Sequence, residues 1–161
     1  MERLQIRTHP DPVLRKRSRP VSAVTEEERK LLDYMVETMY ANQGIGLAAV
    51  QVGVTKRIIV LDAGEGLIRI INPEIRSLAG VTPLEEGCLS LPGKHVEVRR
   101  PSRISCVFID ENNKKREMNF SGLAAKAVQH EIDHLNGKLI IDYIPWFKKL
   151  LSKRGDVECL Q

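Results

Sequence analysis

The sequence predicts an α+β fold: one domain in which mostly antiparallel sheets pack around a central helix. Three observations support this prediction. A helix-forming segment occupies residues 25–42, short apolar runs typical of strands fill the middle of the chain, and a second helical segment follows at 122–136. Helices on either side of a strand-rich region are typical of this class. The 161 residues fit a single domain, whose core we place at about 4–143, with a C-terminal helix or tail at 144–161.

The first helix has a clear start and a clear end. The four residues from Thr25 read Thr-Glu-Glu-Glu, the pattern of a capping box. Apolar side chains then recur at helical spacing from Leu31 to Met39, and the helix is expected to end near Asn42. The preceding residues 1–20 contain three prolines and many charges, so we expect them to run extended over the surface.

Five short runs are predicted as strands. The first two, RIIVLD and LIRIIN, are separated by AGEG and are expected to form a hairpin. Glu-Asn-Asn makes a turn into the last strand. The expected strands are 57–62, 67–72, 95–99, 102–110 and 115–120. A short helix is also expected after Pro145, because proline is favoured at the first helical position.

Composition and charge exclude several classes of function. Basic residues are mostly scattered and aromatic residues make up only 4%, so there is no stacking platform for a specific nucleic acid. No apolar run approaches the roughly 20 residues that span a bilayer, and the N-terminus lacks the apolar core of a signal peptide. We therefore expect a cytoplasmic location and no membrane partner. The odd set of three cysteines argues against disulfides, and Cys106 is expected in the core.

The second helix contains the motif H-E-x-x-H. His130 and His134 are four residues apart and share one helical face, so both imidazoles can reach one metal ion. Glu131 points about 100° away, which suits a general base acting on a ligand of that metal. The alternative is a hydrogen-bonded pair of core histidines without a metal.

A catalytic metal needs a third protein ligand and an open position. The extended pattern H-E-x-x-H-x-x-G-x-x-H would place a histidine where this chain has Ile140. Glu158 is an alternative, but it lies in a basic tail. We favour Cys88, because a thiolate and two imidazoles form a tetrahedral site with one open position. Alone, Cys88 could equally be a buried apolar residue or a nucleophile.

The sequence resembles the peptide deformylases in three motifs. They are GIGLAAVQ (Gly44–Gln51), EGCLS (Glu86–Ser90) and QHEIDH (Gln129–His134), in order and intact. The resemblance extends from about Leu4 to Tyr143. It implies an α+β fold and a metal-dependent hydrolase that removes the N-formyl group from the N-terminal formylmethionine of newly made polypeptides, releasing formate.

The resemblance also implies the metal site and the chemistry. Cys88, His130 and His134 are expected to bind one divalent ion per chain, Fe²⁺ in the first place, with Zn²⁺, Ni²⁺ or Co²⁺ able to replace it. A water molecule on this ion attacks the formyl carbon, and Glu131 acts as general base and then as general acid.

Two further groups are expected to stabilise the oxyanion, the Gln51 side-chain amide and the Leu89 backbone N–H. As the resemblance implies, the backbone of Ile45, Gly46 and Gly87 is expected to pair with an extended peptide.

The methionine side chain of the substrate needs an apolar slot. Ile45, Leu123 and Ala127 are its expected walls, although ordinary core packing would also explain them. Two supporting interactions are expected. Asp133 pairs with Arg99 or Arg100, and Glu86 holds the loop that carries Cys88.

The chain departs from many family members at His95, where an arginine is common, and in its short basic tail at 148–154. The resemblance implies formylmethionyl peptides as partners. We also expect transient ribosome contact and a monomeric state.

Three other functions compete with this hypothesis. One is a zinc metallopeptidase of the H-E-x-x-H type with Glu158 as its third ligand. The others are a metal-stabilised binding module with a closed site, and a thiol hydrolase with Cys88 as nucleophile.

Overall fold

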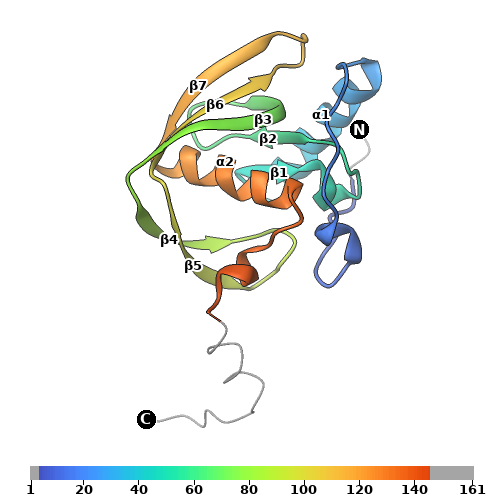
Figure 1. Cartoon of the computed structure of the whole chain (residues 1–161). Helices are drawn as coiled ribbons and strands as arrows, with labels where there is room; N and C mark the ends of the chain where they lie inside the picture. Colours follow the sequence, from blue (N-terminus) through green and yellow to red (C-terminus); the bar gives the residue numbers. More distant parts are fainter. Residues whose placement is uncertain (1–3, 146–161) are drawn as a thin grey trace, which may run out of the picture.

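The computed structural model describes residues 4–145 and shows one helix held between two sheets (Figure 1). The larger sheet has the strand order β1-β2-β3-β6-β7, and the smaller consists of β4 and β5. All strand pairs within the two sheets are antiparallel. The strands are β1 (Gly46–Ala48), β2 (Ile58–Leu61), β3 (Ile68–Ala79), β4 (Thr82–Gly87), β5 (His95–Arg100), β6 (Arg103–Ile109) and β7 (Lys115–Ser121).

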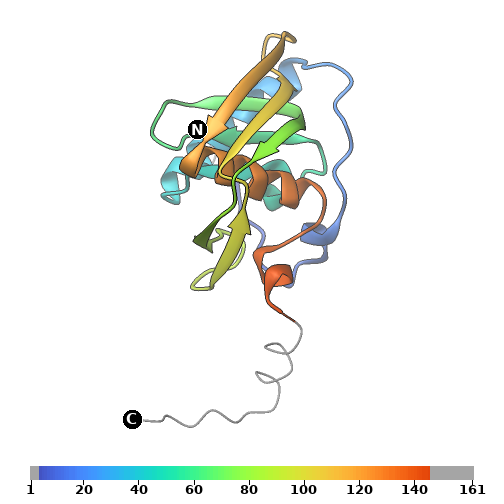
Figure 2. The same ribbon diagram turned by 60° about the vertical axis from the view of Figure 1, so that its left-hand side comes forward.

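The two α-helices cover opposite faces of the larger sheet. Helix α1 (Glu26–Ala41) lies on the outer face, and α2 (Gly122–Leu135) lies between the larger sheet and the β4–β5 sheet, as the turned view in Figure 2 also shows. The α+β class with a central helix is therefore confirmed. Three short 3-10 helices complete the described chain: η1 (Pro12–Arg15), η2 (Ala49–Val52) and η3 (Ile140–Tyr143).

Strand β2 explains why the middle of the chain reads as continuously apolar. Ile59 and Leu61 belong to the apolar cluster that includes α2, whereas Ile58 and Val60 belong to the cluster that includes α1. A strand covered on both faces needs apolar residues at every position. Both helices thereby pack against the same sheet, and this packing fixes the position of α2 relative to the strands.

Helix α1 begins and ends as predicted. Thr25 is the N-cap, Asn42 is the C-cap, and the capping box with Glu28 is formed. The Thr25 backbone N–H donates to Glu28 Oε2 at 2.9 Å, and the Lys56 ammonium donates to Glu28 Oε1 at 2.7 Å. The hydrogen bonds from Lys56 and then Thr25 outweigh burial and lower the pKa of Glu28 from 4.5 to about 2.

We expect Glu28→Gln to lower the free energy of unfolding at pH 7 by about 1 kcal/mol, because glutamine keeps the cap but loses the ion pair. The contribution of Glu28 is present above its unfolded-state pKa near 4.5 and is lost as pH falls toward 2. The difference between wild type and variant should therefore shrink across this acid range in urea unfolding. Glu26→Gln, in the same helical turn but 72% exposed in its side chain, is the control; an equal effect of both changes would contradict the assignment.

Two predictions about the fold need correction. Residues 1–20 do not simply run extended over the surface, because η1 forms at 12–15 and Leu14 is fully buried against Leu91 and Leu139. Strand 67–72 does not end there but continues as β3 to Ala79, with register shifts against β6. Polar residues beyond Asn72 hid this extension from the sequence pattern.

The remaining predicted strands match β2, β5, β6 and β7 within one or two residues, and Cys106 lies fully buried in the core. The sequence pattern missed β1 and β4 altogether. Residues 146–161, including the predicted helix after Pro145, lie outside the described residues. Within 4–145, no helix has the length and apolar character needed to cross a bilayer.

Candidate metal centre

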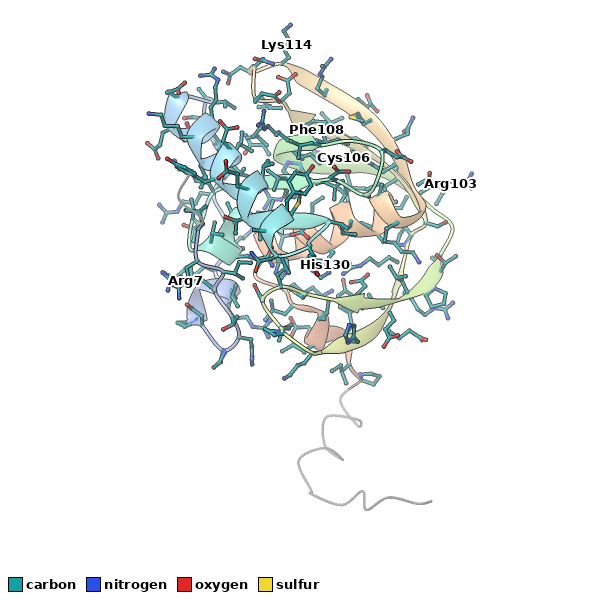
Figure 3. The ribbon with its side chains drawn as sticks, turned by 180° about the vertical axis from the view of Figure 1, so that it is seen from behind. Arg7, Arg103, Cys106, Phe108, Lys114 and His130 are labelled. Atoms are coloured by element: carbon teal, nitrogen blue, oxygen red, sulfur yellow. The ribbon has the colours of Figure 1, made fainter. Side chains whose placement is uncertain are left out.

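Helix α2 brings the two histidines of the motif together. Its apolar residues, such as Ala125 and Val128, pack against the larger sheet, which leaves His130 on the opposite side, toward β4–β5 (Figure 3). The rings of His130 and His134 are in edge-to-face contact with centroids 4.8 Å apart. Their Nε2 atoms are 3.1 Å from each other, so both present the same nitrogen to one point.

Cys88 reaches this point from the other layer of the fold. It directly follows Gly87, the last residue of β4, and its Sγ lies 3.2 Å from His134 Nε2. The three ligand atoms of Cys88, His130 and His134 all lie within 4.8 Å of one another. Among residues 4–145 they form the one group of three or more potential metal-ligating side chains. A sulfur and two imidazole nitrogens suit Zn²⁺, Fe²⁺, Co²⁺ or Ni²⁺.

The electrostatics of the group also suit a cation. Burial opposes the charged form of His130, but contacts with Cys88 and Glu86 outweigh it and raise the pKa of the imidazole to about 10. Positive charge is thus stabilised at this position. Burial, with the neighbouring charge of His130, lowers the pKa of His134 well below its ordinary value. A neutral imidazole is the form that binds metals, so His134 is ready to bind, whereas His130 would give up its proton to an incoming ion. The residues fit a metal through their donor atoms, one sulfur and two imidazole nitrogens.

Glu131 follows His130 on α2 and is itself buried. Burial is the main reason that its pKa is raised to about 7, a value suited to a group that must both accept and donate a proton near neutral pH. Its Oε2 is buried without a hydrogen-bond partner. Because an unpaired buried carboxylate oxygen is costly, this atom indicates a site built for a further polar ligand.

Strand β1 makes room for this carboxylate. A Cβ atom added at Gly46 would lie 2.6 Å from Glu131 Oε1, closer than real Cβ contacts allow. Any side chain at this position would therefore have to move Glu131 or β1. The glycine is thus required by close approach between β1 and α2, which the sequence alone did not reveal.

Gln51 is held with its amide nitrogen toward the Cys88 loop. Its side-chain oxygen accepts from the Ala48 backbone N–H at 2.8 Å, and its Nε2 donates to Ser90 Oγ at 3.2 Å and contacts Cys88 Sγ at 3.7 Å. Because the oxygen is occupied, the orientation of the amide is fixed. A donor nitrogen is thereby aimed at the region of the ligand atoms.

A cavity of about 790 Å³ opens in front of these groups, between β4–β5 on one side and β1 and α2 on the other. The eleven residues predicted to act in catalysis, peptide binding or metal binding lie together here. Ten of them line the cavity, and His134 is the exception. The lining includes Ile45, Gly46, Gln51, Gly87, Cys88, Leu89, Leu123, Ala127, His130 and Glu131. Ile45 and Leu123 are 41% and 48% exposed, so they are surface walls and not ordinary core.

The supporting contacts extend the predicted ones. Arg100, and not Arg99, forms the ion pair with Asp133. Glu86 holds His130 as well as the loop, since its Oε2 lies 3.1 Å from His130 Nδ1. Burial raises the pKa of Glu86, but hydrogen bonds with His130 and Arg100 outweigh it and leave a lowered value. Glu158, the alternative third ligand, lies outside the described residues.

Sequence reasoning missed two groups at the site. Ser90 is fully buried and accepts from Gln51, and Lys126 lines the cavity while its ammonium donates to the Pro83 carbonyl. Ser90 stood inside a quoted motif and could have been singled out there. Lys126 gave no signal, because a lysine on a helix usually faces solvent.

Comparisons with known proteins agree on one family. The model of the polypeptide deformylase family matches residues 3–149. A peptide deformylase of Halothermothrix orenii is 51% identical over 143 residues, which cover 88% of this chain and 93% of the relative.

Solved structures give the same result. The crystal structure of peptide deformylase from Ehrlichia chaffeensis in complex with actinonin has a TM-score of 0.89 and 41% identity, covering 98% of this chain and 100% of that one. A class I type b peptide deformylase from Acinetobacter baumannii, bound to Met-Ala-Ser, has a TM-score of 0.85 and 30% identity, covering 89% and 99%.

Proposed function

The chain belongs to the peptide deformylase family, and on that premise we propose which of its residues carry the reaction. It is a metal-dependent hydrolase that removes the N-formyl group from newly made polypeptides. The observation that carries the residue assignment is the convergence of one sulfur and two imidazole nitrogens within 4.8 Å, beside a buried carboxylate.

The ligands in this proposal are Cys88, His130 and His134, which would hold one divalent ion, Fe²⁺ in the first place, with Zn²⁺, Ni²⁺ or Co²⁺ able to replace it. Such an ion supplies Lewis-acid chemistry: it lowers the pKa of water and polarises a carbonyl oxygen. Glu86 orients the His130 ring by accepting from its Nδ1.

Glu131 moves the protons. Its carboxylate takes a proton from the water that attacks the formyl carbon, and it then gives this proton to the amine nitrogen as the C–N bond breaks. The formyl carbon leaves as formate, and the peptide keeps a free amino terminus. Because Gly46 has no side chain, β1 leaves the space that the Glu131 carboxylate occupies.

Gln51 and Leu89 stabilise the negative charge that develops on the formyl oxygen. The fixed orientation of the Gln51 amide supports this role, because a donor that is already in place costs no reorganisation during the reaction. The Leu89 backbone N–H follows Cys88 directly and would supply the second donor.

The peptide binds along the cavity between β1 and β4. The backbone of Ile45, Gly46 and Gly87 would pair with it, and Ile45, Leu123 and Ala127 would enclose the methionine side chain. The Met-Ala-Ser tripeptide bound by the Acinetobacter baumannii relative supports a peptide that begins with methionine. A cytoplasmic location is proposed with this substrate; ribosome contact and a monomeric state stay predictions.

The test is formate release from formyl-Met-Ala-Ser, measured together with the metal content of each chain. We expect release to stop when a chelator removes the metal and to return with Fe²⁺ under anaerobic conditions. Zn²⁺, Ni²⁺ or Co²⁺ should also restore it. Acetyl-Met-Ala-Ser is the matched control and should stay intact. Formate release by metal-free protein would contradict the proposal and would favour the thiol hydrolase instead.

A further inference from the structure

A buried arginine lies at the centre of the contacts behind the metal ligands. Arg100 ends β5 and is only 4% exposed. Its Nε and Nη2 donate to the two carboxylate oxygens of Glu86 at 2.7 and 3.0 Å, and its Nη1 donates to Asp133 Oδ2 at 2.7 Å. A buried charge of this kind must be fully paired, so the position of each carboxylate depends on the other.

Glu86 transmits this arrangement to a ligand. Its Oε2 accepts from Arg100 Nη2 and also lies 3.1 Å from His130 Nδ1. The guanidinium therefore determines where the partner of the His130 ring sits. Asp133 is connected to the ligands in a second way, because it directly precedes His134 on α2.

Tyr143, ten residues after Asp133, completes the set. It is the last residue of η3, and its hydroxyl donates to Asp133 Oδ2 at 2.7 Å while accepting from Arg100 Nη1 at 3.1 Å. Its ring lies 5.0 Å from Arg100 Cζ and 3.7 Å from the Lys138 ammonium. The hydroxyl thus bridges the arginine and the aspartate, and its hydrogen bonds involve none of the three proposed metal ligands.

Helix η3 is itself fixed in place. Leu139 and Ile140 are buried in the cluster with Leu14 and Val98, so the tyrosine is presented from a packed segment. A hydroxyl delivered in this way can hold Asp133 at one distance from Arg100. Without it, Asp133 has one donor fewer and can draw the guanidinium away from Glu86.

We propose that Tyr143 is a positioning residue of the metal centre, which retains the ion by fixing Asp133 and Arg100 and, through Glu86, the ring of His130. The proposal rests on the metal ligands proposed above. Nothing in the three sequence motifs includes this residue, and its effect is exerted on how long the ion stays bound.

The experiment compares the full chain and Tyr143→Phe, both loaded with Zn²⁺, in excess chromophoric chelator. We expect the variant to release Zn²⁺ about tenfold faster. This is the low end of the loss in metal affinity found when a hydrogen-bond partner of a metal ligand is mutated. Its lower activity on formyl-Met-Ala-Ser should recover in excess metal. Phenylalanine keeps the ring and its packing, so the metal-free variant should stay folded and unfold in a single cooperative transition.

A matched control exists in α1. The Tyr40 hydroxyl donates to Asp62 Oδ2 at 2.7 Å, the same kind of bond away from the cavity lining, and Tyr40→Phe should release Zn²⁺ at the wild-type rate. The route is tested with Glu86→Gln: adding Tyr143→Phe to it should not speed release further, since the connection is already broken. Independent, multiplicative effects would overturn the route through Glu86.

Asp133→Asn provides a second variant on the same route and should also speed release. If Tyr143→Phe and Asp133→Asn both keep the wild-type rate while wild type binds Zn²⁺ and releases formate, only the inference about Tyr143 fails. If wild type binds no stoichiometric metal, the proposed ligands fail instead.

Discussion

Glutamine in place of Glu131 should lower kcat for formate release by about a thousandfold, within the range found for general acid–base groups, while one metal ion per chain is retained. Glutamine has nearly the same size as glutamate but cannot take the proton from water or return it to the amine. The site offers no ready substitute, because Glu131 is 4% exposed and bulk water reaches it poorly. Single-turnover formate release and metal analysis of the same sample measure both quantities.

Glu26→Gln, on the exposed start of α1, is the control for this change and should leave kcat unaltered. If the Glu131 variant retained a tenth or more of wild-type kcat, proton transfer by this carboxylate would not be the chemistry of the site. Loss of metal in the variant would assign Glu131 a role in binding the ion, which the proposal does not give it.

Alanine in place of Cys88 should remove both the metal and the activity. Two imidazoles remain, and losing a direct ligand should weaken metal binding by more than about a hundredfold, beyond the effect of losing an outer partner. Metal content after dialysis, and formate release with and without added Zn²⁺, measure the effect. Partial recovery at high Zn²⁺ concentration is expected for a lost ligand and not for a lost nucleophile.

Cys106→Ala separates this effect from the loss of any thiol. Cys106 is fully buried in the larger sheet, so its replacement should cost about 1 kcal/mol of stability through the cavity that it leaves, with metal content unchanged. Equal metal loss in both variants would show that the Cys88 change acts through the fold and not through ligation.

The parts of the fold that could be predicted are those whose signal is local. The capping box at Thr25 and the spacing from His130 to His134 depend on helix geometry alone. Strand β4 was missed because it contains Pro83, Glu85 and Glu86 and shows no apolar alternation. It is stable because it pairs with β5 and packs near α2, and neither contact can be read from its own residues.

The site divides in the same way. Cys88 could be connected with the histidines because a metal needs a third ligand of suitable chemistry. The contacts of Arg100 with Glu86, Asp133 and Tyr143 join four elements across 14, 33 and 43 residues of sequence, and no spacing rule predicts such a set. The need for Gly46 to lack a side chain also appears only when β1 lies against α2.

The proposed ligands come from two separate layers, Cys88 from the end of the β4–β5 sheet and the histidines from α2. An ion bound there would act as a cross-link between a two-stranded sheet and the rest of the molecule. Such a cross-link would add to the Arg100–Asp133 ion pair and to the buried contacts of Val98 that attach these two strands, so loss of the metal would loosen this sheet before the rest of the fold. Metal starvation would then expose the enzyme to proteases as well as silence it.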